Sequence, residues 1–222
     1  MKNIAATLGC LLALPLAAQP VCLHPGAMAL FERFTSADCA TCWQDAATPT
    51  PGDSALVLDW IVPGHQGDEA PLAAAATGDA LARLAALGRA SPVATDVHTA
   101  PVAGRTGQHL RVGRGPAVND YVGTTITWAA RPRVPTWTFH LLLVEHLPAG
   151  TEGTAVPRNL VRNMLEGTWD KRHALSKNDL LQWMELRPMR IPDGARSERL
   201  RTVGWVQDAR GRVVAAAQSG CP

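Results

Sequence analysis

Two cysteines separated by two residues, Cys39 and Cys42, are the residues whose type and spacing most directly suggest chemistry. They follow a short apolar run and precede a stretch that has helical character for a turn or two before Pro49. At the start of a helix, free backbone N–H groups and the helix dipole stabilise a thiolate. We therefore expect Cys39 to act as the nucleophile and Cys42 to resolve the mixed disulfide that forms.

The same spacing also suits a disulfide that stays closed and only holds the turn, so both interpretations remain open at this point. Zinc would need two further ligands, and the chain has no second cysteine pair of this spacing. The seven histidines offer no tightly spaced pair, His140 and His146 being the nearest approach to one. We expect neither a metal nor a cofactor.

Three residues are candidate neighbours of the cysteine pair. Glu32 lies seven residues before Cys39, and Asp59 lies on the next predicted strand. A buried carboxylate near a thiol can accept the proton of the resolving cysteine, whereas an acidic residue on an amphipathic strand usually faces solvent. Trp43 directly follows the second cysteine, where it either covers the sulfurs, contacts a substrate or packs on its neighbours.

The first 18 residues have the pattern of a secretory signal peptide. Lys2 supplies the positive charge, residues 4–16 form an apolar segment, and small residues end it at Ala18. The apolar segment is too short to span a bilayer. We expect cleavage after Ala18, a periplasmic or secreted mature protein, and no membrane insertion after cleavage.

Export affects how the five cysteines can pair. Cys10 would leave with the signal peptide, and four cysteines in an oxidising compartment allow three pairings. If Cys39 pairs with Cys42, then Cys22 is left to form a structural disulfide with Cys221.

Composition bounds the class of protein. The 222 residues are 46% hydrophobic and 18% charged, which suits a globular protein with a sizeable core. A formal net charge of +2 indicates no nucleic-acid partner. The chain contains no glycine-rich phosphate loop, no Gly-x-Ser-x-Gly sequence and no HExxH sequence, so it lacks the usual signatures of nucleotide-binding enzymes and hydrolases.

The first half of the chain alternates strand and helix patterns. Apolar residues predict strands over 28–35 and 55–62, and the second run is nearly continuous, as in a strand covered on both faces. Residues 69–87 predict a helix that Gly78 interrupts. A strand, a short helix, a buried strand and a helix indicate an α/β domain with parallel pairing.

Beyond about residue 90 the pattern changes mostly to strands, at 109–112, 121–128 and 136–145. Residues 158–166 predict a helix, and residues 180–186 fit either a helix or a strand. Two strands flanking the turn 208–211 predict a closing hairpin with a glycine bulge. Strands at this spacing suggest a β-sandwich.

The chain resembles a family of exported proteins of uncertain function that combine a thioredoxin-like domain, carrying a CxxC sequence, with a β-sandwich domain. Three stretches carry this resemblance: residues 34–42 with the cysteine pair, the Asn-Leu-Val-Arg sequence at 159–162, and the hairpin at 203–216. The resemblance implies an α/β thioredoxin-like domain plus an all-β sandwich domain, which we place at residues 22–105 and 106–222.

The resemblance also implies a function, thiol–disulfide exchange with the thiols or disulfides of an exported partner protein. The alternative is a binding or structural module in which the cysteine pair is a permanent disulfide. Such proteins usually have a proline after the CxxC sequence, where this chain has Trp43. They also hold a cis-proline against the cysteines, for which Pro92 is the candidate and Pro116 the rival.

Overall fold

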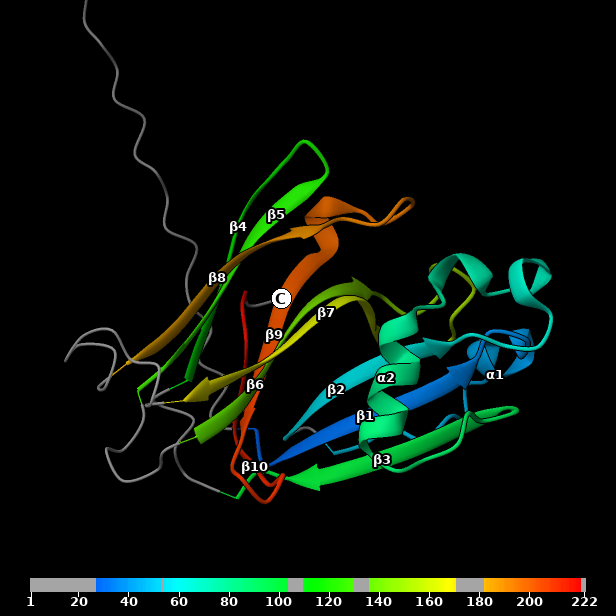
Figure 1. Ribbon diagram of the computed structural model, residues 1–222. Coiled ribbons are helices and arrows are strands. Elements are labelled where there is room, and N and C mark those ends of the chain that lie inside the picture. The colour runs from blue at the N-terminus through cyan, green and yellow to red at the C-terminus, as the bar shows by residue number, and fades with distance from the viewer. Residues whose placement is uncertain (1–26, 53, 104–109, 130–135, 171–181, 221–222) are drawn as a thin grey trace, which may run out of the picture.

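The computed structural model describes residues 27–52, 54–103, 110–129, 136–170 and 182–220. The predicted signal peptide, Cys22 and Cys221 lie outside these ranges. Strands dominate, and they form one seven-stranded and one three-stranded sheet. Figure 1 shows both sheets with the two α-helices at one side of the molecule.

The large sheet has the strand order β10-β9-β6-β7-β2-β1-β3. Its strands are β1 (Ala29–Ser36), β2 (Ala55–Val62), β3 (Thr95–Pro101), β6 (Thr136–Leu147), β7 (Arg158–Asp170), β9 (Leu200–Gln207) and β10 (Val213–Gln218). The small sheet has the order β4-β5-β8. Its strands are β4 (Leu110–Val118), β5 (Tyr121–Trp128) and β8 (Trp183–Arg190).

Helical structure is confined to short segments. The α-helices among the described residues are α1 (Ala40–Gln44) and α2 (Gly78–Ala86). The same described residues also contain the 3₁₀ turns η1 (Gly67–Glu69), η2 (Ala73–Ala75) and η5 (Ser197–Arg199). Gly78 thus begins α2, and the predicted helix over 69–87 is two 3₁₀ turns followed by a nine-residue helix.

The predicted fold class, an α/β thioredoxin-like domain followed by an all-β sandwich, is wrong. The protein is mostly β, and its large sheet takes β1, β2 and β3 from the first half of the chain and its other four strands from the second. The parallel pairing of β1 with β2 is confirmed, but β2 pairs on its other side with β7, at Asp59 and Leu160. The apolar run of β2 is therefore buried inside a sheet that continues into the second half of the chain.

The helix predicted over 158–166 is also wrong, because these residues belong to β7. This strand pairs with β6 along its whole length, and the register shifts where Leu143 faces Asn163 and Val144 faces Val161. Arg162 is the extra residue of this β-bulge. A bulge resets the alternation of inward and outward side chains, so the apolar residues of β7 have a spacing that mimics a helix.

The other strand predictions agree well with the structure. The strands expected at 28–35, 55–62, 121–128 and 136–145 correspond to β1, β2, β5 and β6, and the ambiguous segment at 180–186 contributes to β8. The closing hairpin is β9 and β10, and Gly211 in its turn has a φ of 76°, which a residue with a side chain rarely adopts.

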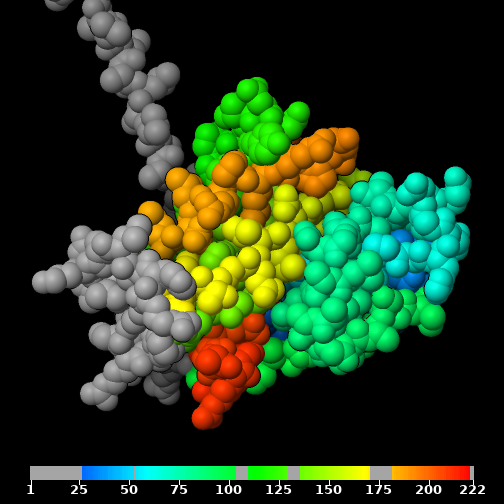
Figure 2. All heavy atoms as spheres, in the orientation of Figure 1, coloured from blue at the N-terminus to red at the C-terminus, as the bar shows by residue number. Residues whose placement is uncertain are grey.

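Two buried layers hold the fold together. On one face of the large sheet, β4, β5 and β8 pack their apolar side chains on β6, β9 and β10. On the opposite face, α2 lies over β1 and β2 (Figure 1). Its buried residues Ala80 and Leu84 belong to the same apolar cluster as Leu30 of β1 and Leu58 of β2. The tip of the β4–β5 hairpin projects from this body in Figure 2.

Candidate functional site

The cysteine pair lies where β1 passes into α1, at one end of the large sheet. Cys39 is the residue that caps the N-terminus of α1, and it forms a disulfide with Cys42 in the first turn of the helix. Both cysteines are half-buried. The two cysteines thus resemble each other in exposure, and neither is enclosed in the core.

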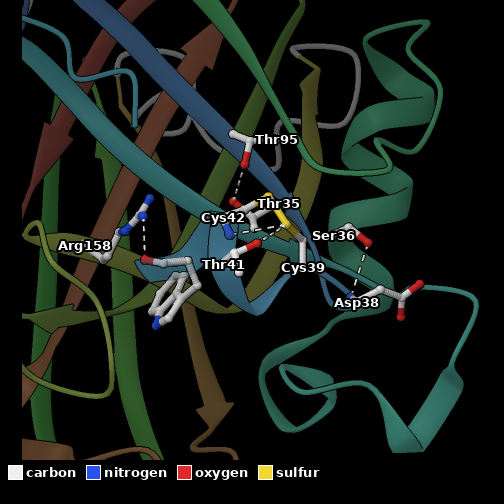
Figure 3. Close-up of a disulfide and its surroundings, with 9 residues drawn as sticks. Thr35, Ser36, Asp38, Cys39, Thr41, Cys42, Thr95 and Arg158 are labelled. Atoms are coloured by element: carbon white, nitrogen blue, oxygen red, sulfur yellow. Dashed lines mark hydrogen bonds between the residues drawn. A yellow bond between two sulfur atoms is a disulfide. The ribbon is translucent and has the colours of Figure 1, made fainter. Parts of the chain in front are cut away.

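Two hydrogen-bonding groups converge on the sulfur of Cys39. The backbone N–H of Cys42 donates to Cys39 Sγ at 3.3 Å, and the hydroxyl of Thr41 lies 3.5 Å from the same atom (Figure 3). A helix of five residues has a small dipole. Local donors, more than the dipole, are therefore what can stabilise a thiolate at Cys39.

Asp38 precedes the first cysteine, but its carboxylate is bound elsewhere. It accepts hydrogen bonds from the backbone N–H groups of His65, at 2.7 Å, and Gln66, at 3.2 Å. Figure 3 shows the carboxylate directed away from the sulfurs. Gly64 makes this possible, because a Cβ atom on it would lie 2.2 Å from Asp38 Oδ1. The acidic side chain thus fastens the loop after β2 to the cysteine turn.

Trp43 is buried under α1 and held by three contacts. Its indole N–H donates to the backbone oxygen of Glu152 at 2.8 Å, in the loop between β6 and β7. Its own carbonyl accepts a hydrogen bond from Arg158 Nη2 at 3.0 Å, and the guanidinium lies 4.8 Å from the centre of its ring. Trp43 therefore packs on its neighbours and anchors the cysteine helix to β7.

Arg158 belongs to a buried cluster with Arg33 and Asp59. Asp59 Oδ1 lies 2.7 Å from both Nε and Nη2 of Arg33 and 3.2 Å from Arg158 Nη1. Its second oxygen accepts the backbone N–H of Asn159 at 2.8 Å. Each of the three charged side chains is at most 2% exposed. Asp59 is thus the shared counterion of two arginines, and no contact joins it to either cysteine.

Glu32 lies on β1 in a second buried cluster. Arg83 of α2 binds its carboxylate through two hydrogen bonds of 2.8 and 2.7 Å, and His98 Nδ1 lies 3.4 Å away. Burial raises the pKa of the Glu32 carboxyl, but the hydrogen bonds and charges of Arg83 and His98 outweigh it, so that the net pKa is lowered. Glu32 is a fixed anion with no contact to the cysteines.

The candidate cis-prolines have only trans peptide bonds, since the described part of the chain contains no cis bond. Pro92 is half-buried in the segment between α2 and β3, and Pro116 lies within β4. The segment of Pro92 does reach the site, because the backbone N–H of Ser36 donates to the oxygen of Ala94 at 2.8 Å. Next along β3, the hydroxyl of Thr95 lies 3.4 Å from that of Thr35.

Sequence reasoning missed Arg158 and Glu152, which come from a segment more than 100 residues after the cysteines. The sequence gives only an indirect indication of Arg158: this residue directly precedes the 159–162 stretch, which belongs to the resemblance described above. No group of three or more potential metal ligands occurs among the residues that the structure describes. No helix in the same residues is long and apolar enough to cross a membrane.

Comparisons with known proteins add little to this picture. No family model matches the chain, and no curated protein matches it. Among solved structures, it is similar to HBP35 of Porphyromonas gingivalis, with 12% sequence identity and a TM-score of 0.45. That match covers 88% of this chain and 75% of the other.

Proposed function

We propose that the protein exchanges disulfides with an exported partner protein through Cys39 and Cys42. The observation that carries this proposal is the surface position of the pair combined with two hydrogen-bonding groups on one of its sulfurs. We expect a thiolate at Cys39 to accept hydrogen bonds from the same two groups after reduction. The exported setting rests on the predicted signal peptide.

The exchange needs only the four sulfurs that take part in it. A thiolate of the partner attacks Cys39 Sγ, the Cys39–Cys42 bond breaks, and Cys42 leaves as a thiolate that takes up a proton. The second thiolate of the partner then attacks its own sulfur in the mixed disulfide and displaces Cys39. The partner gains a disulfide and loses two electrons, which the cysteine pair receives. The same steps run in reverse when the pair begins reduced.

A purely structural disulfide is a poorer account of the same residues. The bond closes a loop of only four residues, and in the chain-entropy treatment such a loop contributes about 2 kcal/mol, less than longer loops do. Meanwhile α1 is already held by Trp43, through its contacts with Glu152 and Arg158, and by the bonds of Asp38 to the next loop. A disulfide would therefore add little to the contacts that already hold α1 in position.

Alkylation and trapping test the proposal directly. The reduced protein is treated with limiting iodoacetamide near pH 7, and the label is mapped by mass spectrometry. We expect label mainly on Cys39, because its thiolate is the stabilised one. Cys42→Ser should trap a mixed disulfide with a model peptide that contains a disulfide, because the Cys39 thiolate attacks that bond and one peptide sulfur leaves as a thiolate, and Cys39→Ser should not. Equal and slow labelling of both cysteines, with no trapping, would contradict the proposal.

A redox titration in glutathione buffers distinguishes a disulfide that takes part in exchange from a permanent structural disulfide. A working exchanger should have a reduction potential of about −120 to −230 mV. A value below about −300 mV, with a disulfide that resists millimolar dithiothreitol in the native protein, would identify a structural bond.

A further inference from the structure

A cavity of about 280 Å³ is lined in part by Arg33 and Arg158, the two arginines of the buried cluster with Asp59. Its walls come from the segment 50–52, the start of β2, the end of β6 and the start of β7. The polar side chains among its lining residues are Arg33, Thr50, His146, Arg158 and Asn159. This cavity has no part in the exchange proposed for the cysteines.

Among the residues that the structure describes, the buried charges beside the cavity do not balance. In two other buried clusters of the described structure each arginine has a carboxylate of its own: Arg83 pairs with Glu32, which also lies 3.4 Å from His98, and Arg162 pairs with Glu145.

In the cavity wall, by contrast, two guanidinium groups share the single carboxylate of Asp59. Asp45 also acts on Arg158, but it is exposed, so that solvent screens its charge. Burial lowers the pKa of the Arg158 guanidinium, Asp59 opposes this, and the charge of Arg33 adds to it.

An unmatched buried cation is costly, and an anion that reaches it from the cavity would relieve that cost. The hydroxyl of Thr50, which also lines the cavity, can donate a hydrogen bond to such a ligand. His146 Nδ1 donates to Asn159 Oδ1 at 3.1 Å, and this contact holds the imidazole in the cavity wall. Each guanidinium nitrogen of Arg33 and Arg158 already has a protein acceptor, so an anion in the cavity would be attracted by their surplus positive charge and not through a free pair of N–H donors.

We propose that this cavity binds a small oxyanion, a carboxylate, phosphate or sulfate, beside Arg33 and Arg158. The volume sets the size of the ligand, since it is below that of pockets for drug-sized molecules. The site is independent of the redox chemistry, and a protein in which both Cys39 and Cys42 are serine should bind the anion as the natural protein does.

Isothermal titration calorimetry with sodium phosphate, sulfate and succinate at constant ionic strength tests the proposal. Gly52 provides the key variant, because a Cβ atom on it meets nothing within 4 Å and it lines the cavity. Gly52→Glu brings a carboxylate to the cavity, and we expect it to weaken binding of the best anion at least tenfold. Gly52→Gln has the same size without the charge and should retain most of the affinity.

Thr99→Glu on β3, an exposed position outside the cavity, adds the same net charge and should leave binding unchanged. In the absence of added anion, Gly52→Glu should also raise the melting temperature above that of Gly52→Gln, because its carboxylate supplies the missing counterion. If none of the three anions binds at 20 mM (roughly the weakest affinity such a site could usefully have), or if Gly52→Glu and Gly52→Gln bind equally, the proposal is wrong.

Discussion

The chemistry of Cys39 is set by groups within one turn of it. Its sulfur has the backbone N–H of Cys42 and the hydroxyl of Thr41 as neighbours, while Asp38 directs its charge to the next loop. The acidic residue therefore opposes a thiolate at Cys39 less than its place in the sequence indicates. Side-chain direction, which the sequence does not contain, decides the balance.

Replacing Thr41 tests this balance. Thr41→Val removes the hydroxyl at nearly constant volume, and a long, exposed hydrogen bond of this kind contributes about 0.5 to 1 kcal/mol. We expect the reduced protein to react with iodoacetamide about two- to fivefold more slowly at pH 7. Thr99→Val, at an exposed position on β3, serves as the matched control. An unchanged rate would show that the backbone N–H alone supports the thiolate.

His140 is a second residue whose surroundings determine its charge. It is buried, it stacks on Trp205 with ring centres 4.3 Å apart, and its Nε2 lies 3.1 Å from the half-exposed Glu166. Burial and, to a smaller extent, the charge of Arg83 lower its pKa to about 3, against the opposing effect of Glu32. The side chain is therefore neutral in the folded protein.

A depressed histidine pKa makes stability depend on pH with a definite sign. Between about pH 6.5 and pH 3 the unfolded chain binds a proton at His140 that the folded chain does not, so acid favours unfolding. We expect a loss of up to about 1.4 kcal/mol per pH unit in this window from this residue. In urea unfolding at pH 7 and pH 5, His140→Phe should lose less stability on acidification than the natural protein. An identical loss would exclude this residue as the cause.

Among the elements, α1 depends on β7 for its position. The helix has five residues and would not persist alone, since short helices are marginal in water. Arg158 of β7 caps its last turn at the carbonyl of Trp43, and the loop before β7 binds the indole. The cysteine pair is thus held in place by a strand that lies far from it in the sequence.

We expect Arg158→Met to weaken the attachment of α1 to β7. The variant keeps the aliphatic volume but loses the hydrogen bonds to Trp43 and Thr154 and the ion pair with Asp59, and we expect a loss of about 2 to 3 kcal/mol in unfolding free energy. Hydrogen exchange should also become faster over residues 40–48. Arg162→Met, which breaks the ion pair with Glu145, should destabilise the protein without changing exchange in α1. Unchanged exchange in both variants would contradict the anchoring role of Arg158.

Features that depend on residues close together in the sequence could be predicted, whereas features that depend on residues far apart in the sequence could not. The strands β1, β2 and β5 and the turn at Gly211 depend on local patterns and were predicted closely. The nature of β7 was not predictable, because a bulge at Arg162 disturbs its alternation and its pairing partners lie elsewhere in the chain. The cysteine pair was found by its spacing, whereas Arg158 required knowledge of which strands are neighbours.

At the scale of the whole molecule, the stability of the protein depends on how closely the two sheets approach each other. Gly204 lies on β9 beneath the small sheet, and a Cβ atom there would be 2.8 Å from Val112 Cγ1 and 2.9 Å from Ile126 Cδ1. Both neighbours are buried core side chains with little room to move. The absence of a side chain at this position lets the sheets pack at their observed separation.

Gly204→Ala should therefore destabilise the protein by about 1 to 3 kcal/mol through overpacking. Gly123→Ala is the matched control, since it also lies in a strand at this end of the molecule and a Cβ atom on it meets nothing within 4 Å. We expect the control to change stability by less than about 0.5 kcal/mol. Urea unfolding of the two variants distinguishes them, and equal losses would mean that the backbone, not the contact between sheets, is responsible.

The pairing of Cys22 with Cys221 stays a prediction about the ends of the chain. In an oxidising compartment this bond would close a loop of most of the mature protein and contribute about 4 to 5 kcal/mol. Non-reducing peptide mapping of exported protein should recover a peptide that joins these two cysteines. A peptide that links either of them to Cys39 or Cys42 would overturn the pairing.

In the large sheet, the strands from the first half of the chain meet those from the second half where β2 pairs with β7. This pairing has a consequence for the order of folding. Asp59 and Asn159, which are joined across it, lie 100 residues apart. During synthesis the first three strands can pair among themselves, but β2 then presents an open, strongly apolar edge until β7 has left the ribosome. Late closure of this kind is slow because the intervening chain must first be brought together. The large sheet therefore cannot be completed until most of the chain has been synthesised.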